Sequence, residues 1–195
     1  MKVIKLFSVL FLFVLLQQCK IASREVGMDS FYYELDGQSY TPQVDLKLDN
    51  LDGITAPVYI NVTRYPDNNN QDTLADVFIQ AHYATETGLH HLFIRIHDYR
   101  GKGTYYFQTF DAQEKTNLTY AYLKKGGEFT NDGGDFTPMD YYTDENRGIR
   151  GYIRVLYDLP QEGIMEAVFE MDVFNINGDK TEIRKGRFYH HYVYF

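Results

Sequence analysis

Two acidic segments of the chain hold the oxygen ligands that a calcium ion prefers. Asp67 and Asp72 bound the run DNNNQD, and Asp132 and Asp135 lie in the run NDGGD. An EF-hand loop would also need a central glycine and a distal glutamate, and the first run has neither. Asn, Asp and Gly also form ordinary solvated turns. We therefore expect no metal or other cofactor, and these four aspartates are the calcium candidates if that expectation fails.

The six histidines include two adjacent pairs, His90–His91 and His190–His191. Adjacent side chains on a strand point to opposite faces, so neither pair can chelate one ion from a flat strand. His91 and His97 share a face, but at about 3.3 Å per residue they lie about 20 Å apart. A site that joins strands and uses His82, His91 or His191 stays open. The expectation is that these histidines lie on the surface or are satisfied in the core.

Three carboxylates, Glu166, Glu170 and Asp172, fall on one face of a predicted strand. Glycan hydrolysis uses a carboxyl pair roughly 5–9 Å apart in a cleft, and Glu170 and Asp172 meet that spacing. An open, solvated strand face is the simpler interpretation. The few serines after residue 18 do not occur in a G-x-S-x-G context, which excludes a serine hydrolase of that type. We expect no catalytic residue, and a glycan hydrolase with paired carboxylates is the alternative.

Cys19 is the only cysteine in the chain, so it cannot form an internal disulfide. It follows Leu16-Gln17-Gln18, and this spacing resembles the lipobox of bacterial lipoproteins. Gln18 departs from the small residue that is usual before the cysteine. The resemblance implies cleavage before Cys19 and acylation of its thiol, palmitate included. Ordinary cleavage near residues 21–23, which would release a soluble product, is the alternative.

The segment before Cys19 has the layout of a signal peptide. Lys2 and Lys5 precede the apolar run Leu6–Leu16, in which Ser8 is the one polar residue. Eleven residues suit a signal-peptide core, whereas a spanning helix needs roughly 20. We predict a signal peptide over residues 1–18, a lipidated cysteine with a short tether over 19–30, and one domain over 31–195.

The charge of the predicted mature chain excludes two classes of partner. The chain has 19 Lys and Arg and 27 Asp and Glu; without Lys2 and Lys5 the balance is 17 minus 27, which is −10. A net negative chain with scattered basic residues is a poor nucleic-acid binder. It also has no electrostatic attraction to anionic lipid. Attachment to a membrane is therefore expected only through a lipid anchor.

From Phe31 onward the hydrophobic pattern is that of β-strands. Leu74–Tyr83, Leu89–Asp98 and Ile164–Phe174 alternate apolar and polar residues, and the dipeptides at 36–37 (Asp-Gly) and 177–178 (Asn-Gly) are hairpin turns. The chain has 18 Tyr, 14 Phe and no Trp, and Tyr and Phe favour strands. We predict an all-β fold, a single antiparallel β-sandwich or partly closed barrel of about 8–10 strands.

The longest segment expected to be irregular is 124–146, which is rich in Gly and Asp. Long loops in compact domains often carry function, and tyrosine-rich surfaces suit saccharide or protein contacts. We predict that this loop binds a saccharide or protein partner. Its candidate residues are Phe129, Asp135, Phe136, Tyr141 and Tyr142.

The C-terminal run, Phe188–Phe195, ends on an aromatic residue and resembles the last strand of outer-membrane barrels. A small integral outer-membrane β-barrel is therefore a further alternative. The charged residues Arg95, Glu166 and Glu170 would then have to face the lumen. Such a barrel would need no lipid anchor.

The layout of the whole precursor resembles a family of uncharacterised lipoproteins from Bacteroidota-type bacteria. The resemblance covers most of residues 31–190 and rests on short strand and turn motifs: Phe31…Asp36-Gly37…Tyr40, Ile96–Tyr105, Gly151–Val155, Ala167–Met171, Asn175–Gly178 and Gly186-Arg187-Phe188. Family members more often have Gly-Thr-Phe where this chain has Glu-Ala-Val-Phe. The resemblance implies a β-sandwich-like domain in the cell envelope, anchored in the outer membrane, and it carries no catalytic residues. The expectation is thus a non-catalytic envelope lipoprotein that binds a ligand or partner.

Overall fold

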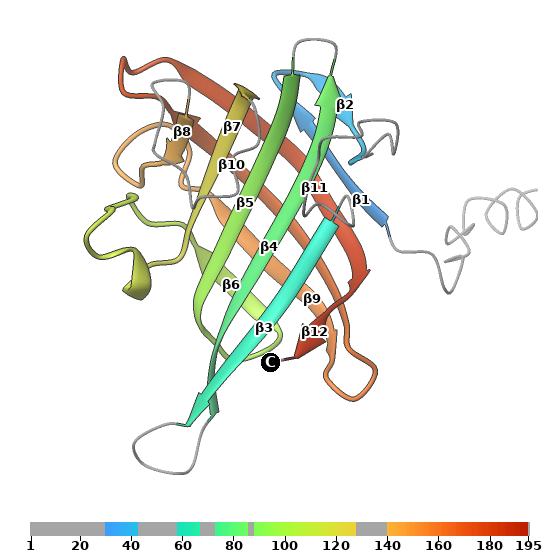
Figure 1. Ribbon diagram of the computed structural model, residues 1–195. Helices are drawn as coiled ribbons and strands as arrows, with labels where there is room; N and C mark the ends of the chain where they lie inside the picture. Colours follow the sequence, from blue (N-terminus) through green and yellow to red (C-terminus); the bar gives the residue numbers. More distant parts are fainter. Residues whose placement is uncertain (1–29, 43–57, 67–72, 86–87, 128–139, 195) are drawn as a thin grey trace, which may run out of the picture.

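The computed structural model of the protein describes residues 30–42, 58–66, 73–85, 88–127 and 140–194 (Figure 1). These residues form twelve strands and one 3-10 turn. The strands are β1 (Ser30–Leu35), β2 (Gln38–Tyr40), β3 (Val58–Pro66), β4 (Thr73–Thr85), β5 (Gly88–Tyr99), β6 (Gly103–Tyr106), β7 (Tyr120–Gly127), β8 (Asp140–Thr143), β9 (Tyr152–Leu159), β10 (Ile164–Phe174), β11 (Lys180–His191) and β12 (Val193–Tyr194), and the turn η1 is Lys115–Asn117.

One sheet contains all of these strands. Ten of them follow the order β12-β3-β4-β5-β7-β8-β10-β11-β1-β2, and β6 and β9 lie off this path. All pairings are antiparallel except that of β12 with β3. Two strands share one edge of β10: β9 pairs with its first part, and β8 pairs with Val173 and Phe174. β6 lies beyond β9.

The sheet curls into a partly closed barrel with two facing walls. We call β3, β4, β5 and β7 the front wall and β9, β10, β11 and β1 the rear wall, as they lie in Figure 1. β8 joins the walls on one side because it pairs with both β7 and β10. On the other side the chain leaves β11 through Tyr192 and enters β12, which pairs with β3. The predicted fold class, an antiparallel sandwich or partly closed barrel, is confirmed.

The space between the walls is filled by one apolar cluster. Successive side chains on a strand alternate between its faces, so every second residue points inward. On β10 the inward side chains are Met165, Ala167, Phe169, Met171 and Val173, and all five are fully buried. They pack against equivalent side chains of the other strands, among them Ile79, Leu92, Ile94, Leu123, Ile183 and Phe188.

A bulge in β11 explains the glycine within that strand. The register with β10 shifts between Phe169 and Met171, and Lys185 has a positive φ of 51°. Gly186 follows directly and lies opposite Phe169; a Cβ there would come within 2.3 Å of the Phe169 ring. Gly186 therefore lets a large buried ring pack directly against the backbone of the neighbouring strand, beside the bulge.

Several predicted strand boundaries were wrong. Residues 124–146 were expected to be irregular, but β7 continues to Gly127 and β8 occupies 140–143. β6 is short and ends at Tyr106. There Phe107 turns into the core, and its amide donates to the carbonyl of Gly151 at 2.9 Å. Residues 107–119 then cross the outside of the barrel and contain η1.

Candidate functional site

The outer face of the front wall carries a row of aromatic side chains. The strand register places Phe93 of β5 directly opposite Tyr122 of β7, and Tyr122 opposite Tyr142 of β8. Tyr142 in turn lies opposite Phe174 of β10. These four residues share the face that points away from the core, because their neighbours along each strand point inward. Side chains that lie directly opposite in a sheet are close enough to interact.

The rings of Phe93, Tyr122 and Tyr142 form a chain of contacts, which Phe110 extends. Phe93 and Tyr122 are stacked with centroids 4.9 Å apart, and Tyr122 and Tyr142 lie 6.1 Å apart. Phe110, from the segment between β6 and β7, stacks on Tyr142 at 4.5 Å with an interplanar angle of 16°. We call Phe93, Tyr122, Tyr142 and Phe110 the aromatic row. All four rings are half-buried, so part of each is open on the outer face.

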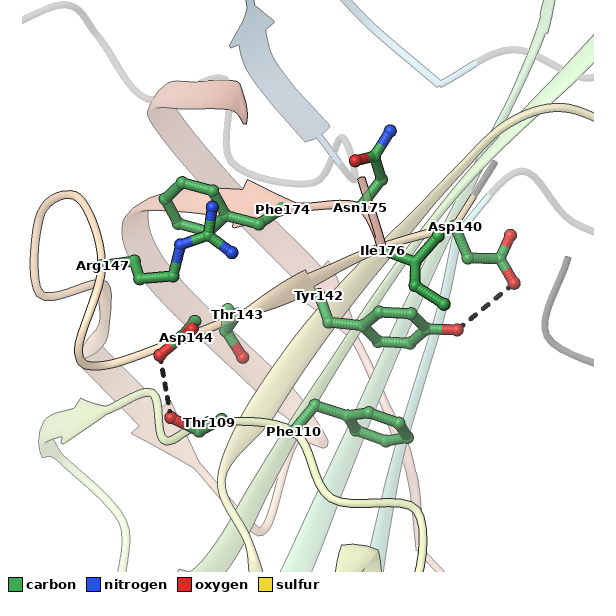
Figure 2. Close-up of a pocket in the computed structure, with 10 residues that line it drawn as sticks. All are labelled: Thr109, Phe110, Asp140, Tyr142, Thr143, Asp144, Arg147, Phe174, Asn175 and Ile176. Atoms are coloured by element: carbon green, nitrogen blue, oxygen red, sulfur yellow. Dashed lines mark hydrogen bonds between the residues drawn. The ribbon is translucent and has the colours of Figure 1, made fainter. Parts of the chain in front are cut away.

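The aromatic row ends in a cavity of about 440 Å³ (Figure 2). The cavity lies where β8, the end of β10 and the segment 107–119 meet. Its lining consists of Thr109, Phe110, Asp140, Tyr142, Thr143, Asp144, Arg147, Phe174, Asn175 and Ile176. A volume of roughly 300–1,000 Å³ with a mostly apolar lining and a few polar groups is typical of ligand sites.

Backbone hydrogen bonds hold the segment 107–119 beside β8. The amide of Phe110 donates to the carbonyl of Thr143 at 3.0 Å, and the hydroxyl of Thr143 donates to the carbonyl of Gln108 at 2.9 Å. These bonds place the Phe110 ring against Tyr142, as Figure 2 shows. The stacked wall of the cavity is therefore fixed by the fold.

A buried ion pair anchors the same segment from the other side. Asp76 of β4 and Arg95 of β5 are both buried and pair with each other. The Arg95 guanidinium also donates to the carbonyls of Lys115 and, at 2.6 Å, Thr116 in η1. The carboxylate of Asp76 further binds Nδ1 of His97 at 2.9 Å. A charge-assisted network of this kind holds a loop firmly on a sheet.

Three charged groups line the cavity. The Asp140 carboxylate accepts a hydrogen bond from the Tyr142 hydroxyl at 3.3 Å. The Asp144 carboxylate accepts from the Thr109 hydroxyl at 3.1 Å. The Arg147 guanidinium lies over the ring of Phe174, 4.2 Å from its centroid. Figure 2 shows the two carboxylate bonds and the Arg147–Phe174 contact on different sides of the cavity.

Burial keeps the phenols of the aromatic row protonated. It raises the pKa of Tyr142, and the nearby Asp140 carboxylate adds to the effect by its charge and its hydrogen bond. Burial also raises the pKa of Tyr122, with Tyr120 and Asp140 contributing. Both hydroxyl groups are therefore hydrogen-bond donors at any physiological pH.

A stacked histidine pair lies one row away from the aromatic row. His82 of β4 is opposite His91 of β5, and their rings are 4.5 Å apart with an interplanar angle of 10°. Burial lowers the pKa of His82 to about 4; burial, His82 and Lys124 lower that of His91 to about 3. Both rings are therefore neutral at physiological pH. Within the described ranges no group of three His, Cys, Asp or Glu side chains is arranged to hold a metal ion.

Most of the predicted ligand loop and all of the calcium candidates lie outside the described residues. Tyr142 lines the cavity, whereas Tyr141 points inward and packs against the core. The Lys125 ammonium lies 4.9 Å from the centroid of the Tyr141 ring. The predicted site residues that lie outside the described ranges are Cys19, Asp67, Asp72, Phe129, Asp132, Asp135 and Phe136.

The expected solvated face of β10 is in fact buried at two of its three carboxylates. Glu166 is 1% exposed and binds Arg187 at 2.7 Å, and Asp172 is 3% exposed and binds Arg184 at 2.5 Å. The amide of Ile149 donates to the other oxygen of Asp172 at 3.0 Å. This burial has a physical cause: the arginines of β11 and the loop 144–150 supply hydrogen-bond and ion-pair partners, which offset the cost of removing these carboxylates from water.

Sequence reasoning missed Phe93, Phe110, Tyr122, Arg147 and Phe174 as members of one site. Each comes from a different strand or loop, and only the register of four strands, β5, β7, β8 and β10, brings them together. Alternation along 89–98 predicts that Phe93 points outward. The alternation pattern does not show which strands are neighbours, so it does not predict which outward side chains lie side by side.

Comparison with known proteins adds no assignment to this site. Among the residues that the structure describes, no helix is both long and apolar enough to cross a bilayer. The search for similar proteins found that no family model, no curated protein and no solved structure matches the chain.

Proposed function

We propose that this protein is a non-catalytic saccharide-binding module of the bacterial cell envelope. The observation that carries the proposal is the aromatic row, which crosses three neighbouring strands and ends in the cavity beside β8. Aromatic rings offer large, rigid, flat contact surfaces at little cost in conformational entropy. A sugar ring can stack on such a surface through its apolar face.

The polar groups of the cavity complement the hydroxyl groups of a sugar. Asp144 offers an acceptor, Arg147 offers donors, and both lie near the Phe110–Tyr142 stack. A saccharide ligand needs this combination, because each hydroxyl both donates and accepts hydrogen bonds. A few polar groups in an otherwise apolar pocket fix the orientation of a ligand.

The carboxylates of the cavity do not form the pair that glycan hydrolysis requires. Asp140 begins β8 and Asp144 directly follows its last residue, and in extended chain this four-residue spacing separates their Cα atoms by about 13 Å. Each is already bonded to a neighbour, Asp140 to Tyr142 and Asp144 to Thr109. On β10, Asp172 is bonded to Arg184 and Ile149. These arrangements favour binding over catalysis.

Glycan binding is testable with purified protein, residues 20–195, and a panel of soluble polysaccharides. Affinity electrophoresis in gels that contain laminarin, dextran, mannan or polygalacturonate measures retardation by each. We expect retardation by at least one glycan, and Phe110→Ala should weaken it roughly tenfold because the stacking surface is lost.

The matched control is Tyr157→Ala, which removes a 38% exposed aromatic ring from the rear wall. It should bind like the wild type. Equal loss in both variants, or no retardation of the wild type by any glycan of the panel, would sink the proposal.

The proposed location rests on the leader and on Cys19. We propose that residues 1–18 are removed and that a lipid on Cys19 tethers the domain to the outer membrane, as in the Bacteroidota-type lipoproteins that the precursor resembles. Intact-mass measurement of the membrane fraction should find a diacyl- or triacylglyceryl mass on the wild type and none on Cys19→Ala. An unmodified chain that starts near Arg24 would contradict the anchor.

The packing supports a tethered domain over an integral barrel. The interior is filled with apolar side chains, while the outer face of the rear wall carries the ion pairs Glu166–Arg187 and Asp172–Arg184. Charged residues on a lipid-facing surface cost free energy. Extraction with alkaline carbonate should release Cys19→Ala from membranes; retention of that variant would favour the integral barrel.

A protein partner is the second candidate for the same site. Ile176 lines the cavity and is 84% exposed, which is unusual for an isoleucine. Exposed apolar groups beside aromatic and arginine residues are typical of protein interfaces. If the ligand is a protein, Ile176→Ser should weaken its binding, because an exposed apolar contact at the rim of the site is lost.

A further inference from the structure

The cavity in Figure 2 is lined by the carboxylate of Asp144, whose orientation is fixed by the fold. Asp144 follows β8 directly, and its Oδ1 accepts hydrogen bonds from the Thr109 hydroxyl at 3.1 Å and from the Asn146 amide at 3.0 Å. Within the described part of the chain, its Oδ2 accepts no hydrogen bond. One carboxylate oxygen of Asp144 is therefore held in place while the other is open to a ligand.

Arg147 belongs to the same turn as Asp144, since its amide donates to the Asp144 carbonyl at 3.2 Å, and its guanidinium is held by two contacts that leave donors available. Its guanidinium carbon lies 4.2 Å from the centroid of the Phe174 ring, and its Nη2 donates to the carbonyl of Gly178 at 3.2 Å. Neither contact uses Nε or Nη1, and in the described ranges no acceptor binds these two atoms. The cavity thus presents a fixed acceptor and a fixed set of donors.

The charge of the cavity decides what kind of sugar it suits. Two carboxylates, Asp140 and Asp144, face one guanidinium, Arg147, so the formal charge of the lining is −1. The whole chain has a net charge of −8. A uronic acid or sulfated sugar would bring a second negative charge close to both carboxylates, where like charges repel. A hydroxyl group, by contrast, can donate to Asp144 and accept from Arg147 without any charge penalty.

We infer that the cavity binds a neutral glycan: one sugar ring packs its apolar face against the exposed part of the Phe110–Tyr142 stack while its hydroxyls donate to Asp144 and accept from Arg147. This inference rests on the proposed saccharide-binding function and names the class of saccharide. Asp144 and Arg147 are binding residues that select for uncharged hydroxyl groups. The aromatic row supplies the stacking surface and is indifferent to which neutral sugar occupies it.

The test compares neutral and acidic polysaccharides on the same protein. Affinity electrophoresis uses laminarin, dextran and mannan as neutral probes and polygalacturonate as the acidic probe. The wild type should be retarded by at least one neutral glycan and not by polygalacturonate. Asp144→Asn, which keeps the shape and removes the charge, and Arg147→Met should each weaken that retardation roughly tenfold.

Two further measurements separate the outcomes. Asp111→Asn, on the exposed part of the same segment, is the control and should bind normally. Thermal unfolding shows whether a variant is folded, and if one cavity variant is not, the other decides. Preference for polygalacturonate, or unchanged binding by both cavity variants, overturns the inference alone. Failure of every glycan to retard the wild type overturns it together with the proposed function.

Discussion

The two walls of the barrel use their outer faces differently. On the rear wall, outward carboxylates are buried under arginines: Glu166 binds Arg187 and Asp172 binds Arg184. The front wall has one buried pair of the same kind, Asp76–Arg95, but most of its exposed outer surface near β8 is a row of stacked rings, which begins at Phe93 and ends at the cavity. Both walls bury the same kind of apolar surface inside. The difference teaches that the inner faces determine the fold, while the outer faces divide stability and binding between them.

The largest effect is expected on the rear wall. Arg184→Ala removes the closer cation paired with the buried Asp172, leaving only the more distant Lys180 at 3.9 Å among the described residues, and three hydrogen bonds, to Asp172 and to the carbonyls of Met171 and Ile183. Removing one partner of a buried pair leaves an uncompensated charge, so the free energy of unfolding should fall by about 3 kcal/mol. Chemical denaturation followed by circular dichroism measures it.

The control for that experiment is Arg154→Ala on the same wall. Arg154 is exposed, and among the described residues it contacts the Thr104 hydroxyl at 3.2 Å and the Tyr152 ring. We expect a loss below about 1 kcal/mol. Similar losses for Arg154→Ala and Arg184→Ala would show that the rear-wall pairs do not stabilise the fold in the way proposed.

The next effect concerns the pH dependence of the front wall. The pKa values of His82 and His91 are lowered by burial to about 4 and about 3 in the folded chain, against an ordinary value of about 6.5. Above pH 6.5 both states are neutral. As the pH falls from 6.5 to 4, the unfolded chain takes up protons that the folded chain does not, so the free energy of unfolding falls, by at most about 3 kcal/mol for each histidine.

His91→Phe keeps the stacked ring and removes one of these titrations. Its stability should therefore fall less steeply between pH 6.5 and 4 than that of the wild type. His191→Gln, at an exposed position, should leave the slope unchanged. Denaturant midpoints measured at several pH values give both slopes, and parallel curves for His91→Phe and the wild type would count against the buried pair as their source.

A smaller effect tests whether the aromatic row is a physical unit. The rings of Phe93 and Tyr122 stack at 4.9 Å, so the double-mutant cycle of Phe93→Leu with Tyr122→Leu should give a coupling of about 1 kcal/mol. The control cycle combines Phe93→Leu on the front wall with Tyr157→Leu on the rear wall, and their effects on the free energy of unfolding should be additive. A coupling near zero for Phe93 and Tyr122 would break the contrast between the walls.

The inner faces could be predicted from the sequence because they depend on a local pattern. Alternation along 89–98 places Leu92, Ile94 and Ile96 inside, and the structure buries all three. The Asp-Gly dipeptide at 36–37 likewise predicts the first hairpin, and both of its residues have positive φ. Each of these two predictions depends only on residues that are close together in the sequence.

The outer faces could not be predicted because they depend on register between distant strands. Alternation places Glu166 outside, but its burial requires Arg187 of β11. In the same way Tyr142 becomes one wall of a cavity only because Phe110, from another segment, is tied to β8 by the bond from its amide to Thr143. The predicted ligand loop contained Tyr142, but nothing in the local sequence indicated the stack beside it.

The most direct test of the front wall as the binding face is hydroxyl-radical footprinting with and without the polysaccharide that retards the protein most. Mass spectrometry reads the oxidation of individual aromatic residues. The proposal predicts that bound glycan protects Phe93, Phe110 and Tyr142 and leaves Tyr106 and Tyr157 of the opposite side unchanged. Protection of Tyr106 and Tyr157 with no change in the aromatic row would contradict it.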